Sequence, residues 1–126
     1  MVKKNKNVTM ALQGNCTHKE YNTVDDEMVV TPTDYTDVYV MVKQVEFFQT
    51  YQDQSLEGEE PNIVKHQAVL FQIAGYESKE ARDADQEDWL FWEPMELLDY
   101  VYSANLLEQC YNKVKGAEGY TELTDI

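Results

Sequence analysis

Two long stretches with the composition of β-strands are the feature that most constrains the fold of this chain. Residues 37–51 and 63–76 are both rich in Val, Tyr and Phe, the residue types that favour extended, half-buried backbone. The segment between them, 52–62, contains Gly58 and Pro61, which are typical of turns. We therefore expect two long strands joined by a mobile, acidic hairpin loop.

The apolar alternation in the first of these stretches changes face partway along. Valines occupy one face as far as position 42, whereas Val45 and Phe47 belong to the opposite parity. An extra residue in one strand produces such a change. The sequence thus predicts a β-bulge near Lys43 and Gln44.

The later half of the second stretch should be the better buried half, because apolar side chains of one parity gather there: Val69, Phe71 and Ile73. Shorter strands are expected at 8–13, 26–30, 89–92 and 95–102. Pro32 should end the second of these short strands and Pro94 the third. A helix beginning near Pro94 competes with the strand at 95–102.

Two helices are predicted from their capping residues. Ser78 can cap a short surface helix over 79–85. Asn105 and Glu108 have capping-box spacing before an amphipathic helix that ends at Gly116. Its apolar face consists of Leu106, Leu107, Cys110, Tyr111 and Val114.

This order of elements predicts an α+β fold that is mainly antiparallel β, a small sheet or sandwich with the C-terminal amphipathic helix packed on it. The length of 126 residues suits a single β-rich domain over 10–126, preceded by a flexible basic arm over 1–9. No apolar run reaches the roughly 20 residues that a membrane-spanning helix needs. The N-terminus lacks the apolar stretch of a secretory signal, so a cytoplasmic compartment, at least at synthesis, is expected.

The chain is strongly acidic, with 24 Asp and Glu against 10 Lys and Arg and a net charge of -14. Residues 77–99 hold nine acids against two basic residues, a net -7, which is half of the total. Such an excess repels nucleic acid and acidic membrane surfaces. We expect neither a direct nucleic-acid partner nor a membrane partner.

No arrangement of residues indicates catalysis. His18 and His66 lie far apart, and neither has a neighbouring nucleophile motif. Cys16 and Cys110 lack the spacing of a zinc or redox motif, so they are expected to be ordinary thiols. The acidic groups at 25–27 and 83–87 could attract Ca²⁺, but the second lacks the central glycine and distal Glu of a calcium loop. The glycines are scattered, so no phosphate loop is indicated. We predict a protein that is not an enzyme and has no catalytic, cofactor-binding or metal site.

The sharpest local feature is the aromatic run Trp89-Leu90-Phe91-Trp92 inside the acidic region. Burial of one strand face explains part of it, but a strand points alternate side chains to opposite faces. An outward-facing aromatic side chain is the usual anchor of a protein interface. The candidate interface residues are Trp89, Phe91, Trp92, Tyr100, Tyr102 and Tyr39.

Several short strings resemble segments of small structural proteins of tailed bacteriophages. They are Met10-Ala11-Leu12-Gln13-Gly14, the segment 77–82, the terminal helix 107–115, Gly119-Tyr120 and Thr124-Asp125-Ile126. The resemblance implies a non-enzymatic virion component of the neck, tail or baseplate. Its implied partners are other virion proteins and copies of itself in a ring or trimer.

A second class of function stays open from the charge alone. An acidic protein can mimic DNA and occupy the basic groove of a host nuclease or of a DNA-repair or defence enzyme. Such a mimic needs carboxylates spaced along one face, and its complex weakens sharply as salt rises.

Overall fold

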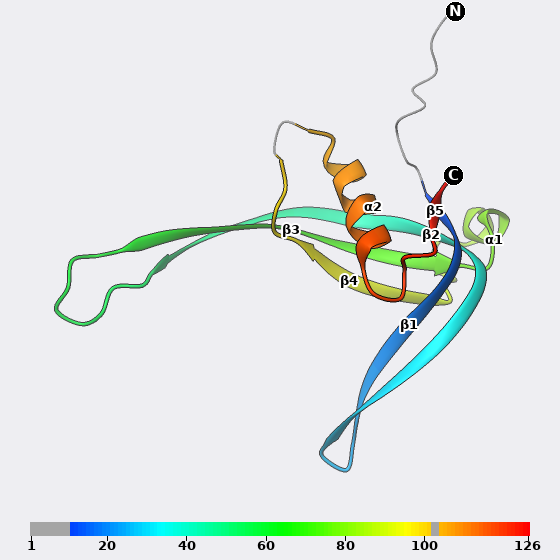
Figure 1. The fold of residues 1–126 in the computed structure, drawn as a ribbon, viewed down its shortest axis with the longest axis horizontal. Coiled ribbons are helices and arrows are strands. Elements are labelled where there is room, and N and C mark those ends of the chain that lie inside the picture. Colours follow the sequence, from blue (N-terminus) through cyan, green and yellow to red (C-terminus); the bar gives the residue numbers. More distant parts are fainter. Residues whose placement is uncertain (1–10, 102–103) are drawn as a thin grey trace, which may run out of the picture.

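The computed structural model describes residues 11–101 and 104–126 and contains one antiparallel sheet of five strands, in the order β4-β3-β2-β1-β5. The strands are β1 (Leu12–Val24), β2 (Glu27–Asp53), β3 (Ile63–Tyr76), β4 (Phe91–Leu97) and β5 (Thr124–Asp125). The helices are α1 (Lys79–Ala84) and α2 (Leu106–Gly116). Figure 1 shows α2 lying across one face of the sheet. The predicted α+β class with a C-terminal helix is confirmed, and the strands of residues 11–101 and 104–126 form a single sheet with no second layer.

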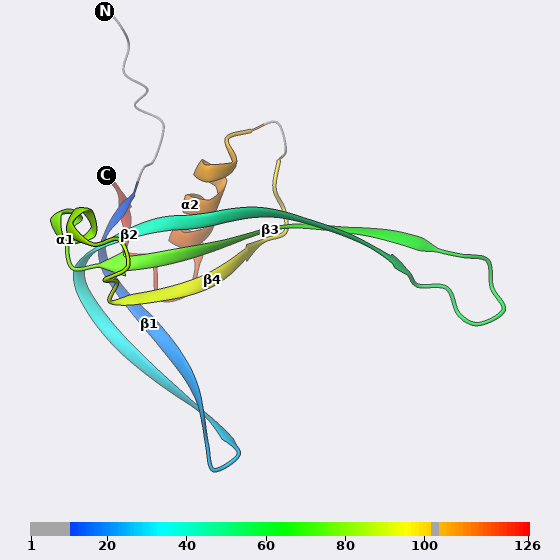
Figure 2. The same ribbon diagram turned by 180° about the vertical axis from the view of Figure 1, so that it is seen from behind.

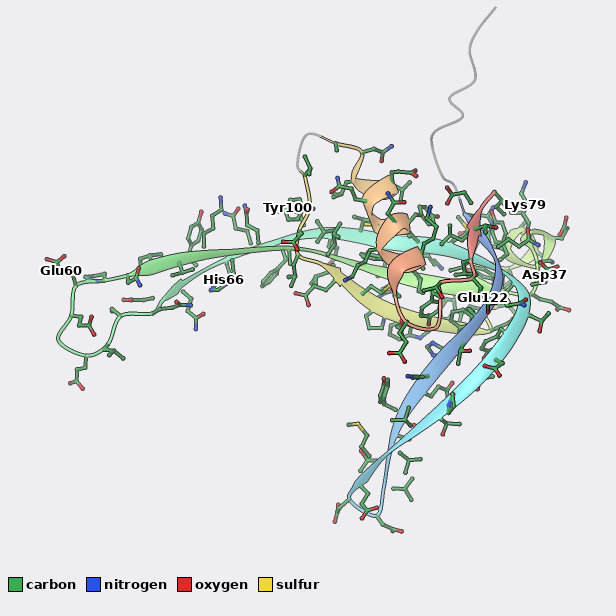
Figure 3. The ribbon with its side chains drawn as sticks, viewed as in Figure 1. Asp37, Glu60, His66, Lys79, Tyr100 and Glu122 are labelled. Carbon is green, nitrogen blue, oxygen red and sulfur yellow. The ribbon has the colours of Figure 1, made fainter. Side chains whose placement is uncertain are left out.

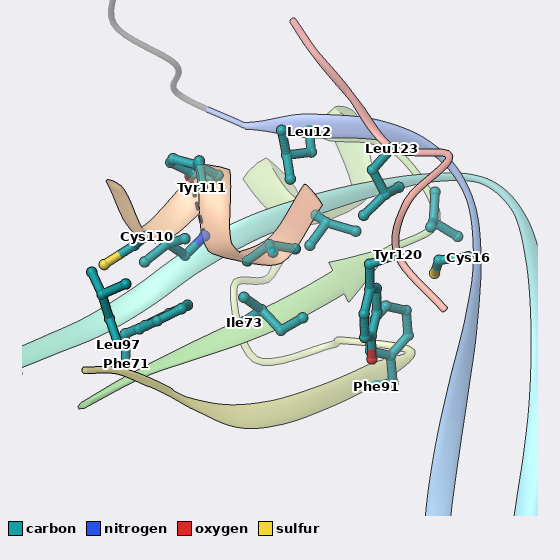
Figure 4. Close-up of a cluster of buried hydrophobic side chains, with 14 of the residues drawn as sticks. Leu12, Cys16, Phe71, Ile73, Phe91, Leu97, Cys110, Tyr111, Tyr120 and Leu123 are labelled. Atoms are coloured by element: carbon teal, nitrogen blue, oxygen red, sulfur yellow. Dashed lines mark hydrogen bonds between the residues drawn. The ribbon is translucent and has the colours of Figure 1, made fainter. Parts of the chain in front are cut away.

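Helix α2 anchors the main core. The Asn105 side chain accepts a hydrogen bond from the Glu108 amide and begins the helix as predicted. The predicted apolar face turns toward the sheet, and the Tyr111 hydroxyl accepts a hydrogen bond from the Val42 amide at 3.1 Å. Figure 4 shows the core side chains between helix and sheet, which include Leu12, Phe71, Ile73, Phe91, Leu97, Cys110, Tyr111, Tyr120 and Leu123.

Helix α1 covers one end of the opposite sheet face. Ser78 caps it by accepting a hydrogen bond from the Ala81 amide, and none of its residues is buried, as predicted for a surface helix. Beneath it lies a smaller cluster of buried side chains around Tyr39 and Tyr76. The Arg82 guanidinium lies over the Tyr39 ring, 5.7 Å from its centre. Within the described residues, no helix lies over the rest of this sheet face (Figure 2).

Two irregular positions bend the long strand β2. The predicted bulge is confirmed: the register shifts between Lys43 and Glu46, and Gln44 has a φ of 48°. A second bulge lies at Asp37, which has a φ of 51° opposite the register shift between Gly14 and Cys16. A bulge bends and twists its strand. Strand β2 therefore changes direction on both sides of the core.

Strand β2 is much longer than the short stretch where β1 and β3 both pair with it, so its two ends extend as arms. Over its first half it pairs with β1, over its second half it pairs with β3, and the two pairings overlap only near Tyr39 and Val40. Each end of the 27-residue strand thus runs on as a two-stranded ribbon. Figure 1 shows the two ribbons leaving the core in different directions. We call residues 19–34 the first arm and residues 46–67 the second arm.

The predicted strand ends at the two prolines are wrong. Strand β2 continues through Pro32, which pairs with Lys19, and β4 continues through Pro94, which pairs with Gln72. Proline is tolerated in strands that lack a neighbour on one side. Pro32 lies in the first arm, where β1 is the only partner strand of β2, and β4 is an edge strand of the sheet.

Other boundaries also differ from the predictions. Strand β1 continues to Val24 instead of ending at position 13, whereas residues 1–10, including the predicted basic arm, lie outside the described residues. The strands expected at 89–92 and 95–102 are one shorter strand, β4, with no helix beginning near Pro94. Gly116 is the last residue of α2, and Ala117 caps the helix with ordinary negative φ.

Candidate assembly surfaces

The two arms carry large apolar side chains that no other part of the described chain covers well. The first arm exposes Tyr21, Val24, Met28, Val29 and Val30, and the second exposes Phe47, Phe48, Tyr51, Leu56 and Ile63. An isolated two-stranded ribbon is at best marginally stable in water. Exposed apolar groups gathered on such a projection mark contact surfaces. Figure 3 shows the arms bearing side chains on both faces.

The stem of the second arm is polar but nearly uncharged. Gln67 donates a hydrogen bond to Gln49 across the ribbon at 3.0 Å, and Gln49 donates one to the Tyr51 hydroxyl at 2.9 Å. Between 47–52 and 63–67 the only formal charge is Lys65. Apart from Glu46 at its base, the acids of this arm lie at its tip, from Asp53 to Glu60. The stem is thus one of the least acidic surfaces of an acidic protein.

Asp53 closes the predicted hairpin loop. One carboxylate oxygen accepts hydrogen bonds from the Ser55 amide at 2.9 Å, the Ser55 hydroxyl at 2.7 Å and the Asn62 amide at 3.2 Å. The hydrogen bonds from Ser55, and then that from Asn62, lower the pKa of Asp53 below its ordinary value of 3.8. The two strand ends are thereby joined through one ionised side chain.

Acid should loosen this loop. Because the pKa of Asp53 is lower in the folded arm, the carboxylate stabilises the loop above pH 3.8, and this contribution is lost as the pH falls through the lower folded value. We expect the amide NMR signals of Ser55 and Asn62 to titrate together with a midpoint below 3.8. The same titration should be absent in Asp53→Asn. A midpoint at or above 3.8 would contradict this account of the loop.

A groove of about 700 Å³ separates the first arm from β4. One wall is formed by residues 18–22 of β1 and the other by residues 89–94. Within the described residues, β4 pairs only with β3, and β1 beyond residue 18 pairs only with β2. The groove therefore runs between two free strand edges, in the angle that the first arm makes with β4 in Figure 1.

The floor of the groove is a buried polar cluster. The His18 ring stacks on Phe91 at 4.9 Å, and His18 Nδ1 shares a hydrogen bond of 3.0 Å with the Tyr120 hydroxyl. Burial, and next the neighbouring Glu93 carboxylate, raise the pKa of the Tyr120 hydroxyl. These contacts hold the base of the first arm against β4 and the C-terminal segment.

The rim of the groove is acidic. Lys19 is paired with Glu118 at 3.2 Å, so its charge is largely compensated. Glu20 and Glu93 both line the groove, and His18 Nδ1 lies 3.8 Å from a Glu93 oxygen. A partner that fits this groove should therefore be neutral or basic.

The predicted interface residues fall into different places. Trp92 is 47% exposed, and Trp89 is partly exposed beneath the Lys43 ammonium, which lies 4.9 Å from the centre of its ring. Tyr100 is partly buried and meets Phe47 edge to face. Phe91 and Tyr39 are 3% and 5% exposed, so both belong to the core and offer no contact surface in this structure. Tyr102 lies outside the described residues.

The thiols and histidines do not form a reactive arrangement. Burial, and for Cys16 also the Glu93 carboxylate, raise the pKa of both cysteine thiols to about 11. A thiol with such a pKa is almost wholly protonated at neutral pH and is a poor nucleophile. His66 lies on the second arm, far along the chain from the buried His18. In the described part of the chain, no three His, Cys, Asp or Glu residues are placed to hold a metal ion.

Sequence reasoning missed the arm residues as surface candidates. Phe48, Tyr51, Met28 and Val30 were treated only as strand-forming residues. Phe48 and Tyr51 did have a signal in the sequence, because the stretch 37–51 continues past the part that alternates cleanly. A strand that is longer than its buried part must continue beyond the core as a ribbon.

Comparisons of the chain with protein-family models, with curated proteins and with solved structures found no match. Neither helix of the described residues has the length and apolar character needed to cross a membrane. The arguments about function below therefore rest on the residues and geometry of this chain.

Proposed function

We propose that the protein is a non-enzymatic structural component of a tailed-phage virion, of the neck, tail or baseplate, and that it acts through protein–protein contacts. The observation that carries the proposal is the pair of projecting arms, whose exposed apolar side chains require a partner surface. The sequence strings that resemble phage structural proteins supply the class of particle. The predicted partners are other virion proteins and further copies of this chain.

The surface charge supports an assembly role in a second way. Thirteen of the 24 acids lie in three groups, at the two arm tips (25–27 and 53–60) and around α1 (77–88). They keep subunits in solution while the nearly uncharged stem of the second arm stays available for contact. A DNA mimic would need its carboxylates in one continuous row, and this separation into three places does not favour it.

Recovery with intact particles tests the proposal. Cells that naturally produce the protein would be lysed, and virions would be separated from soluble protein on a density gradient, with detection by an antibody against this chain. We expect the protein to migrate with the particles and to stay there after a wash in high salt. Recovery solely in the soluble fraction, or in a salt-sensitive complex with a host nuclease, would contradict the proposal.

A further inference from the structure

We propose that the groove between the first arm and β4 receives the stem of the second arm from another copy of this chain. The proposal deepens the assembly role and rests on it, because it names the partner and the two surfaces of one contact. Both surfaces are present on every copy, so the contact is heterologous. Contacts of this kind close into a ring when the rotation between neighbours allows it.

The shape of the groove fits an extended ribbon. It is open along two strand edges, those of β1 at 18–22 and of β4 at 91–94. Strand edges with unpaired backbone groups are the usual places where another extended segment is added. The second arm is itself such an extended segment. Within the described residues, residues 46–53 of β2 pair only with β3, and residues 63–68 of β3 pair only with β2.

Side chains on the two surfaces also match. Trp92 and Leu90 are both exposed and both line the groove. Phe48 and Tyr51 are exposed on the stem of the second arm. Exposed aromatic groups on both sides supply the anchors that interfaces of this kind use.

Its low charge makes the stem a better occupant of the groove than the acidic parts of the chain. Glu20 and Glu93 make the groove acidic, so an acidic arm tip would be repelled. Lys65 is the only formal charge on the stem. The contact between groove and stem avoids this repulsion.

The test uses the full chain and measures its oligomeric state by light scattering after size exclusion. Phe48→Asp alters the stem, and Trp92→Asp alters the groove. Each variant alone should be monomeric, with at least about a tenfold loss of self-association. An equimolar mixture should form a dimer and nothing larger, because one intact stem still meets one intact groove. Leu98→Asp, at an exposed apolar position outside both arms and the groove, is the matched control and should assemble like the unaltered protein.

Far-UV circular dichroism would first establish that each variant is folded, and Leu90→Asp serves as the second groove variant should Trp92→Asp unfold. The proposal is overturned when both single variants assemble normally, or when the mixture remains monomeric. It is also overturned when the unaltered chain is monomeric at all concentrations. In that last case recovery in particles would still support the virion role, so failure of the contact and failure of the function are distinguishable.

Discussion

Replacing Phe91 by Ala should lower the free energy of unfolding by about 3–5 kcal/mol, the usual cost of emptying a buried aromatic site. The ring is the centre of an aromatic cluster, stacked on His18 at 4.9 Å and in contact with Tyr35 at 4.9 Å. On its other side it lies against Gly75, where an added Cβ would come within 2.2 Å of the ring. The neighbouring strands cannot close this space without moving the base of the first arm.

The adjacent tryptophan provides the matched control for Phe91. Trp92 lies on the opposite face of β4 and is 47% exposed. Trp92→Ala should therefore cost about 1 kcal/mol or less in unfolding free energy. Urea titration of both variants measures the difference. Equal losses for the two variants would mean that β4 is not oriented as described.

Gly119→Ala should lower the free energy of unfolding by about 2–4 kcal/mol, because strain and a steric clash act together. Gly119 has a φ of 91°, and a Cβ there would come within 2.4 Å of the Thr17 carbonyl oxygen. The Gly119 carbonyl also accepts a hydrogen bond from the Thr17 amide at 2.8 Å. Any shift that relieves the clash therefore weakens the link between the C-terminal segment and β1.

Gly116 is the control for this second substitution. A Cβ at Gly116 meets nothing within 4 Å, and the residue ends α2. Gly116→Ala should be neutral or stabilising by up to roughly 1 kcal/mol, because Ala favours the helix. Thermal unfolding of the pair gives the comparison. A Gly119→Ala protein as stable as Gly116→Ala would refute the strained link.

The sequence contained enough information to predict the local elements well. The change of parity after position 42 located the bulge at Gln44, and the capping pattern located the start of α2 at Asn105. Both predictions depend on a few neighbouring residues, which is the range over which backbone preferences act. The two prolines misled the prediction because their tolerance depends on whether a neighbouring strand is present, and that is a property of the whole sheet.

The candidate surface was harder to predict, because exposure is decided by residues distant in sequence. Tyr39 has the parity opposite to the valines of the main core, yet Arg82 and α1 cover it. Phe91 and Trp92 are equally aromatic neighbours, and the packing of His18, Tyr35 and Tyr120 around Phe91 distinguishes the buried one. The groove depends on the angle between β1 and β4, which no periodicity encodes.

One strand belongs to both arms, and this has a mechanical consequence. Strand β2 runs without interruption from the first arm through the core to the second arm, a contour of about 90 Å at the usual rise per residue. When neighbouring molecules are bound to both arms, a pulling force between them passes along a single covalent backbone, that of β2. The side chains of the core are then not required to bear it. A protein built in this way can withstand a larger pulling force between its arms than the packing of its core side chains alone could.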